Sequence, residues 1–111
     1  MKQETRVELL QGTLDMMVMQ TLLSGKANGY EIAKAIARLS DDVLAVDHGS
    51  LYPALHRLEK AGLIAGKWEV SSTNRQARFY RLTPAGRKRL LLERSKWEQM
   101  AAAVTRVMGV A

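Results

Sequence analysis

A short amphipathic helix that runs directly into two β-prone segments is the feature that most constrains this chain. Residues 50–61 repeat apolar side chains at helical spacing, and the members of this stripe are Leu51, Leu55 and Leu58. The charged side chains of Arg57 and Lys60 fall on other sides of the same helix. Gly62 follows, a residue type that commonly ends a helix. The sequence therefore predicts an amphipathic helix with a defined end.

The two β-prone segments predict a hairpin. Residues 67–70 and 77–82 are rich in strand-forming types, and the polar stretch 71–76, SSTNRQ, separates them. A helix followed by a basic hairpin is the winged-helix arrangement. In that arrangement the helix enters the major groove of DNA and the hairpin reaches the flanking backbone or the minor groove.

Positive charge is concentrated on this part of the chain. The whole chain has a formal net charge of +6, and residues 48–90 alone contain nine Lys or Arg against two acidic residues. A concentrated cationic surface attracts a phosphate backbone through counterion release. A solvated basic face, which is common in small soluble proteins, explains the charge about equally well. Charge alone therefore does not decide the function.

A proline fixes where the candidate recognition helix begins. Because proline lacks an N–H and collides with the carbonyl four residues earlier, Pro53 is expected in the first turn, with the helix start at Gly49 or Ser50. The N-terminal end of such a helix is presented to base edges and phosphates. Ala54 and Arg57 are placed on the side away from the leucines, where Arg57 could grip a phosphate or a guanine.

The hairpin supplies the other candidate DNA contacts. Arg75 lies at the expected tip, the part best able to reach the minor groove or its phosphates. Arg78 is ambiguous, because strand alternation puts it on one face with Tyr80 and Leu82, which look buried, while Phe79 falls on the other face. The full set of expected DNA-binding residues is Ser50, Tyr52, Pro53, His56, Arg57, Lys60, Arg75 and Arg78.

The first half of the chain predicts two further helices. One is expected to begin at Leu9 or Thr13 and to end at Ser24. The other covers residues 29–39, where Asn28 is the expected N-cap and the glutamate three residues later completes a variant of the capping box. This helix is expected to turn Ile32, Ile36 and Leu39 inward.

For two aromatic side chains, the sequence allows either a buried or an exposed position. Tyr30, in the first turn of the second helix, could pack in the core or offer its hydroxyl to a phosphate, and core packing is favoured. Trp68 is interpreted as a packed anchor between hairpin and helices rather than as a base-stacking ring. Both rings are therefore left out of the predicted DNA-binding set.

The last helix is expected to carry an apolar seam. Thr83 is a good N-cap and Pro84 suits the first helical position. Apolar residues then follow a heptad pattern that Glu93 interrupts, and the expected dimerisation residues are Leu90, Trp97, Met100, Val104 and Val107. A lone helix with this stripe must fold back on its own domain or meet a partner.

Several classes of protein are disfavoured. The chain has no cysteine, which fits a cytosolic setting, and no apolar run near the roughly 18–20 residues of a membrane span. Asp41, Asp42 and Asp47 are interpreted as caps and turn formers rather than as a metal cluster with His48. Neither a phosphate-binding loop nor a paired nucleophile and base is found. No catalytic residue, metal site or cofactor is predicted.

A combination of motifs carries a family resemblance. The run GSLYPALHRLEKAGLI, the Lys67–Trp68 pair and the run RFYRLTPAG (78–86), in this order and spacing, closely resemble the PadR family of bacterial transcriptional regulators. Residues 12–90 resemble its DNA-binding domain, and the tail resembles its short form with a single C-terminal helix. The expected fold is α+β, mostly α: a winged helix-turn-helix DNA-binding domain at 1–83 and a continuous C-terminal dimerisation helix at 84–111.

The resemblance implies a cytoplasmic, homodimeric repressor that binds a palindromic operator in double-stranded DNA and is released by a small-molecule effector. The last helix would pack with the first helix of the other subunit. Trp97 matches in spacing a tryptophan that stacks flat ligands at the dimer centre of multidrug-binding members, although interface packing is favoured here. The alternatives are a multidrug-sensing repressor and a winged-helix protein-interaction module. DNA binding requires Arg57 and Arg75 to share a surface, unpaired with carboxylates of their own subunit.

Overall fold

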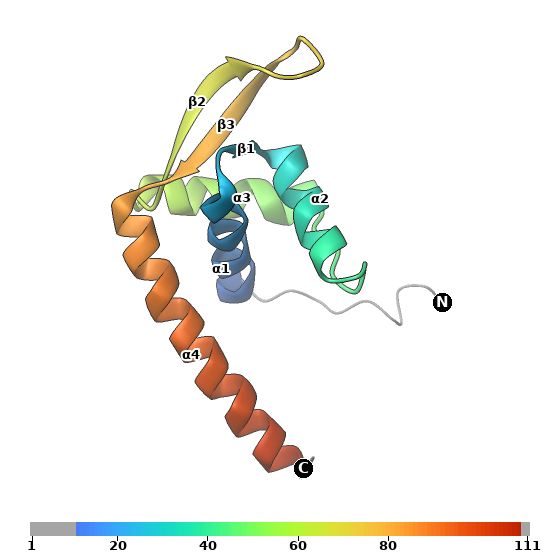
Figure 1. Ribbon diagram of the computed structural model, residues 1–111, viewed down its shortest axis with the longest axis vertical. Coiled ribbons are helices and arrows are strands. Elements are labelled where there is room, and N and C mark those ends of the chain that lie inside the picture. Colours follow the sequence, from blue (N-terminus) through green and yellow to red (C-terminus); the bar gives the residue numbers. More distant parts are fainter. Residues whose placement is uncertain (1–10, 110–111) are drawn as a thin grey trace.

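A winged helix-turn-helix with a long C-terminal helix is seen in the computed structural model, which describes residues 11–109 (Figure 1). Its elements in chain order are α1 (Gln11–Thr21), the 3-10 turn η2 (Leu22–Ser24), β1 (Ala27–Asn28), α2 (Gly29–Leu39), α3 (His48–Lys60), β2 (Ile64–Val70), β3 (Gln76–Leu82) and α4 (Pro84–Met108). The predicted class, α+β and mostly α, is confirmed. Residues 1–10 and 110–111 lie outside the described range, and with them the expected helix start at Leu9.

One hydrophobic core joins the helices to the base of the hairpin. Its members include Leu14, Val18, Ile32, Ile36, Leu51, Leu55, Leu58, Ile64, Tyr80 and Leu90. The leucine stripe of α3 is buried, as predicted. Ala54 was expected on the outer side of this helix and is fully buried instead, because the side of α3 that other elements cover extends beyond the three leucines. This core fixes which side of α3 faces outward.

The start of α2 is confirmed in detail. The side chain of Asn28 accepts a hydrogen bond from the Glu31 N–H at 2.9 Å, and the Glu31 carboxylate accepts one from the Asn28 N–H at 3.0 Å. Ile32 and Ile36 are buried. The prediction for Leu39 is wrong: its side chain is exposed, because it is the last residue of α2, where the chain turns away from the core.

Helix α3 begins earlier than expected. Asp47 is its N-cap and accepts a hydrogen bond from the Ser50 N–H at 2.8 Å, so the first helical residue is His48. Pro53 therefore lies inside the helix rather than in its first turn. The carbonyl that its missing N–H leaves free belongs to Gly49, which is exposed and can be hydrated.

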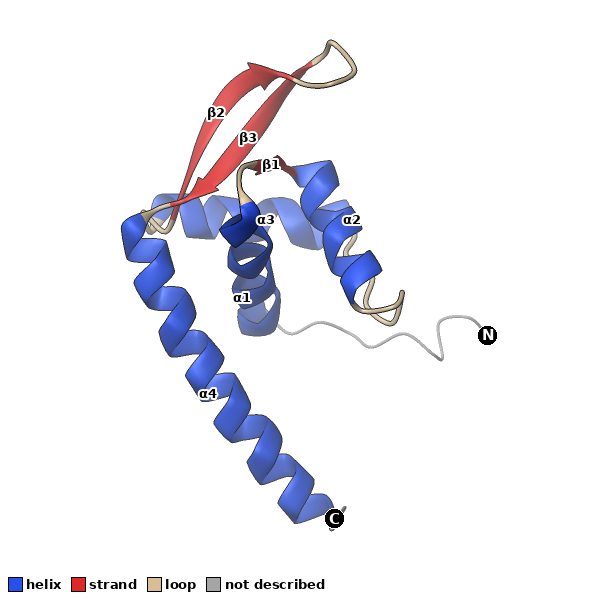
Figure 2. Ribbon diagram, in the orientation of Figure 1, coloured by secondary structure: helices blue, strands red, loops and turns tan. Residues whose placement is uncertain are grey.

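A three-stranded antiparallel sheet in the order β1–β3–β2 builds the wing (Figure 2). The register pairs Trp68 with Arg78 across the hairpin, and the short strand β1 pairs Asn28 with Phe79. Strand β1 was not predicted. Because it covers the base of the hairpin, Phe79 is only 7% exposed, although alternation placed it on the face away from the core.

Helix α4 leaves the hairpin base and projects away from the rest of the domain (Figure 1). Its predicted start is confirmed: the Thr83 hydroxyl accepts a hydrogen bond from the Gly86 N–H at 3.0 Å and donates one to the Gly62 carbonyl at 2.7 Å. Pro84 is the first helical residue. Within residues 11–109, no helix is both long and apolar enough to span a bilayer.

We expect Gly86→Ala to destabilise the fold. A Cβ at this position would collide with the backbone carbonyl oxygen of Leu63 and would lie 2.6 Å from Cδ1 of Leu82. Because a backbone atom cannot move aside as a side chain can, the loss in the free energy of unfolding should be about 1–3 kcal/mol or more. Urea denaturation followed by circular dichroism measures this loss.

Gly12→Ala is the matched control for Gly86→Ala. Gly12 lies in α1, and within residues 11–109 a Cβ there would meet no atom within 4 Å apart from its chain neighbours and the backbone of its own helix. Since alanine is favoured over glycine in a helix by about 1 kcal/mol, this variant should be as stable as the native protein or more so. Equal effects of the two substitutions would contradict the packing described for Gly86.

Candidate nucleic-acid interface

The outward side of α3 carries most of the predicted DNA-binding residues. The exposed members on this helix are Ser50, Tyr52, Pro53, His56 and Lys60. Pro53, His56 and Lys60 follow one another at three- and four-residue steps, so they form one row along the helix. At the N-terminal end the ring of His48 stacks on Tyr52, with ring centroids 5.5 Å apart. We call Pro53, His56 and Lys60 the α3 row.

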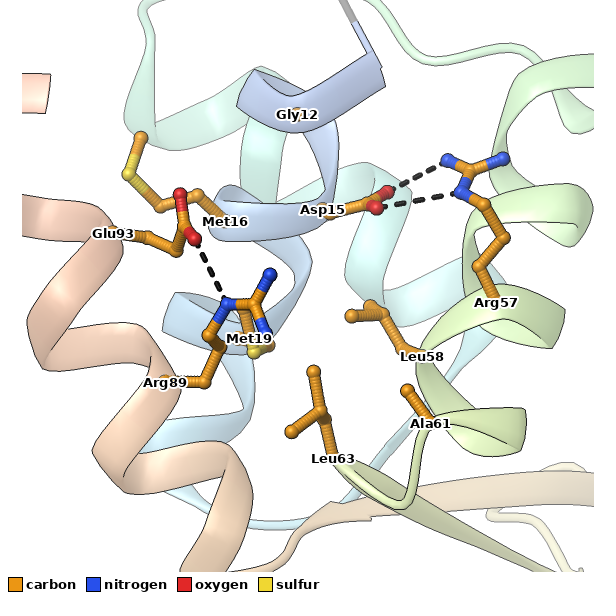
Figure 3. A pocket seen from close by; sticks show the side chains of 10 residues that line it. All are labelled: Gly12, Asp15, Met16, Met19, Arg57, Leu58, Ala61, Leu63, Arg89 and Glu93. Atoms are coloured by element: carbon orange, nitrogen blue, oxygen red, sulfur yellow. Dashed lines mark hydrogen bonds and ion pairs between the residues drawn. The ribbon is translucent and has the colours of Figure 1, made fainter. Parts of the chain in front are cut away.

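Arg57 does not belong to the α3 row, contrary to the sequence prediction. Its guanidinium is directed toward α1, where Nη2 and Nε donate to the carboxylate of Asp15 at 2.7 and 3.4 Å (Figure 3). The expectation that Arg57 is free of carboxylates of its own subunit, on which DNA binding was made to depend, is therefore wrong. The physical reason is that Arg57 lies on the flank of α3 that faces α1. A cationic surface shared by α3 and the wing lacks Arg57 and has to rest on other exposed cations, such as Lys60 and Arg75.

Arg75 lies where the hairpin tip was predicted. The turn is closed by hydrogen bonds from the Ser71 N–H to the Arg75 carbonyl at 2.7 Å and from the Asn74 N–H to the Ser71 carbonyl at 2.9 Å. Asn74 adopts a left-handed conformation with φ of 62°, which asparagine tolerates better than most residues. The side chain of Arg75 is exposed and, among the described residues, makes no ion pair.

Arg78 connects the wing to α3 instead of pointing into solvent. It forms an ion pair with Glu59 of α3, and its guanidinium lies 5.9 Å from the ring centroid of Tyr80. Hydrogen bonding to Glu59 raises the pKa of Arg78. Burial raises the pKa of the Tyr80 hydroxyl. Arg78 thus sets the position of the wing relative to α3.

A cleft of about 790 Å³ lies between α2, α3 and the wing. Its aromatic lining includes Tyr30, Tyr52 and Trp68. Two predictions are wrong here, since Tyr30 is 63% and Trp68 is 60% exposed. Trp68 lies on the outer half of the hairpin, beyond the part that packs on the core. The ring of Tyr30 turns outward under the Lys34 ammonium, which is 5.3 Å from its centroid.

The opposite face of the wing is anchored by two cations that share one carboxylate. Glu69 of β2 forms ion pairs with Lys26 at 2.5 Å and with Arg81 at 2.7 Å. The hydrogen bonds from Lys26 and Arg81 lower the pKa of Glu69 to about 2. Lys26 also lies 5.3 Å from the ring centroid of Phe79. These contacts connect the hairpin to the segment before β1.

Sequence reasoning missed the acidic partners Asp15, Glu59 and Glu69. The signal for Asp15 was available, because it is the one charged residue between positions 11 and 24. A single charge in an otherwise apolar and neutral helix suggests a partner on a neighbouring element. No sequence pattern indicates the partners of Glu59 or Glu69. The pairs Glu59–Arg78 and Glu69–Lys26 form only when the wing folds against the rest of the domain, and Glu69–Arg81 depends on the register of the hairpin.

The predicted seam on α4 is exposed except at its first member. Trp97, Met100, Val104 and Val107 are exposed, whereas Leu90 is 1% exposed and belongs to the core of its own subunit. The prediction of Leu90 as a dimerisation residue is therefore wrong, because α4 still packs on α1 at this position. Trp97 lies beside Met16 and Met17 of α1, around a hollow of about 220 Å³.

The acidic residues around the start of α3 act as sequence analysis indicated. Asp47 caps α3, and Asp41 and Asp42 adopt left-handed conformations in the turn after α2. Between residues 11 and 109, no group of three or more His, Cys, Asp or Glu side chains is arranged to hold a metal ion.

We expect Glu69→Gln to destabilise the protein in a pH-dependent way. The folded pKa of about 2 lies below the ordinary value of 4.5, so the carboxylate stabilises the fold above pH 4.5, and this contribution disappears as pH falls toward 2. The difference in unfolding free energy between native and variant should therefore be largest near neutral pH and should shrink in acid. Glu98→Gln, at an exposed position on α4, is the control. A pH-independent difference for Glu69→Gln would contradict the ion pairs.

Comparison with known proteins identifies the family. The model of the transcriptional regulator PadR-like family matches residues 18–91. Transcriptional regulator Rv3488 of Mycobacterium tuberculosis is 46% identical over 59 residues, 53% of this chain and 54% of that protein. A transcriptional regulator from Clostridium thermocellum has a similar structure, with a TM-score of 0.79 and 30% identity over 86% of this chain and 93% of that chain. For a PadR-like regulator from Bacillus cereus the TM-score is 0.75, with 25% identity over 89% and 94% of the two chains. The chain therefore belongs to the PadR-like family and is a transcriptional regulator, not an enzyme.

Proposed function

We propose that this regulator binds double-stranded DNA as a two-fold homodimer, with α3 in the major groove and the wing on the flanking backbone or minor groove. The observation that carries the proposal is the α3 row together with Arg75 on the wing tip. Lys60 and Arg75 are exposed and, within residues 11–109, neither makes an ion pair. Unpaired cations on both parts of a winged helix favour a phosphate backbone as the partner.

The proposed contacts differ in kind. Lys60 and Arg75 contact phosphates, because each presents a cation to solvent. His56 and Tyr52, with Ser50 and Pro53 at the N-terminal end of α3, contact base edges and sugars in the groove. Arg78 acts indirectly, by holding the wing against Glu59.

The proposed dimer rests on the apolar side of α4. A contiguous exposed apolar surface on a projecting helix favours association, since burial stabilises by about 25 cal/mol for each Å² of apolar surface. The stripe consists of Trp97, Met100, Val104 and Val107. A second subunit that covers this stripe would set two α3 helices about one DNA turn apart, which implies a palindromic operator.

We further propose that binding represses transcription and that a small-molecule signal releases it. A ligand site at the dimer interface, as in a multidrug-sensing repressor, is the second candidate. The exposed ring of Trp97 beside Met16 and Met17 favours it, because an indole surface next to thioethers suits a flat ligand.

Salt titration of duplex binding tests the DNA contacts. Each phosphate contact contributes about −0.9 to the slope of log K against log salt. Lys60→Ala and Arg75→Ala should each weaken binding to all duplexes and make the slope shallower by about 0.9 per subunit. Lys96→Ala removes an exposed cation from α4 and should leave the slope unchanged. Absence of duplex binding by the native protein at low salt would refute the proposal.

A charge in the apolar stripe tests the dimer. Val104→Glu places a carboxylate where the partner is proposed to pack, so it should convert the dimer to monomers in analytical ultracentrifugation. The fold should survive, because Val104 is already half exposed. Ser95→Glu adds the same charge at an exposed position on the opposite side of α4 and should leave the dimer intact. A monomeric native protein, or equal association of both variants, would contradict the proposed interface.

A further inference from the structure

The ion pair between Asp15 and Arg57 joins two helices at the edge of the proposed DNA surface. Arg57 donates to both carboxylate oxygens, with Nη2 2.7 Å from Oδ1 and Nε 3.4 Å from Oδ2. The pair is only partly accessible, since the side chain of Arg57 is 35% and that of Asp15 is 21% exposed. Figure 3 shows the guanidinium of Arg57 beside α3, with dashed lines to the Asp15 carboxylate on α1.

Arg57 is close to the α3 row in sequence and in space. It follows His56 directly and precedes Lys60 by three residues on the same helix. A long, flexible arginine side chain on the flank of a helix can reach either the neighbouring helix or a ligand on the outward side. Because the side chain is still one-third exposed, a rotation away from Asp15 needs no repacking of the core.

The surroundings of Arg57 offer its guanidinium one anionic partner within the described part of the chain. The adjacent hollow of about 360 Å³ is lined mainly by apolar side chains, among them Met16, Met19, Leu58 and Leu63. The other carboxylate at this hollow, Glu93, is already paired with Arg89 at 2.9 Å. Whether the Arg57 guanidinium is paired or free therefore depends on Asp15.

Because its guanidinium is paired with Asp15, Arg57 adds no net positive charge to the proposed DNA-binding surface. A phosphate that approaches Arg57 must displace the Asp15 carboxylate or accept its repulsion at close range. A partly exposed ion pair contributes little to the free energy of unfolding, but it cancels the charge that drives counterion release. Removal of Asp15 would leave the fold largely intact and would add one cation to each DNA-facing surface.

We infer that Asp15 is a positioning residue that withholds Arg57 from the phosphate backbone and so limits the sequence-independent affinity of this regulator for DNA. This inference rests on the proposed DNA binding and extends it to a residue on α1, which does not itself face the groove. Limited sequence-independent affinity matters for a regulator, because non-operator DNA competes for it at a great excess of sites.

The experiment measures the salt dependence of binding to a random-sequence duplex, which requires no knowledge of the operator. Four full-length proteins are compared: native, Asp15→Asn, Arg57→Gln and the double variant. Asp15→Asn should steepen the slope of log K against log salt by about 0.9 per subunit, because Arg57 becomes free to contact a phosphate. Arg57→Gln and the double variant should retain the native slope.

The outcomes separate this inference from a merely structural role for Asp15. The slope counts phosphate contacts, whereas a structural role would lower the unfolding midpoint and leave the slope unchanged. An unchanged slope for Asp15→Asn would overturn the inference. If Asp15→Asn did not fold, Arg57→Gln alone would decide. A slope for Arg57→Gln equal to that of the native protein would support the inference. A slope shallower by about 0.9 per subunit would show that Arg57 already contacts phosphate in the native protein and would overturn it.

Two controls complete the design. Glu98→Gln removes one negative charge from an exposed position on α4, so it tests whether net charge alone changes the slope. If Glu98→Gln steepened the slope as much as Asp15→Asn does, net charge alone would explain the effect and the inference would be overturned. If the native protein did not bind the duplex at low salt, the proposed function itself would be overturned. If the native protein bound the duplex but Asp15→Asn left the slope unchanged, only the inference about Asp15 would be overturned.

Discussion

The burial of one side of α3 is the constraint on which the rest of the structure depends. Leu51, Leu55 and Leu58, together with Ala54, lie in the core that α1, α2 and the base of the hairpin complete. Burial of such side chains contributes about 1.5–3 kcal/mol each, so α3 cannot rotate about its axis without a large loss of stability. The outward position of the α3 row follows from this constraint.

Ion pairs within the subunit decide which of its basic residues remain free to bind a partner. Arg57, Arg78 and Arg81 are paired with Asp15, Glu59 and Glu69, respectively. The formal charge of the winged helix therefore overstates its free cationic surface. The paired arginines join α1, α3 and the strands.

Much of the fold could be predicted because its signals are local. The capping box at Asn28, the cap at Thr83 and the leucine stripe of α3 each involve residues within one or two turns. The errors concern contacts between distant segments: Asp15 and Arg57 are 42 positions apart, and Phe79 is covered by the unpredicted strand β1. Periodicity indicates which face of an element is apolar, but not how far along that face the neighbouring elements extend. For this reason it did not predict that Leu39 and Trp68 are exposed and that Leu90 is buried.

The core turns the α3 row outward, and we propose that a second subunit places two such rows on one duplex. Selection of bound duplexes from a random pool by the native protein tests this most directly. The expected motif is an inverted repeat whose half-sites are centred about 10–10.5 base pairs apart, or a multiple of that spacing. Enrichment of an asymmetric motif, or none at all, would contradict the claim.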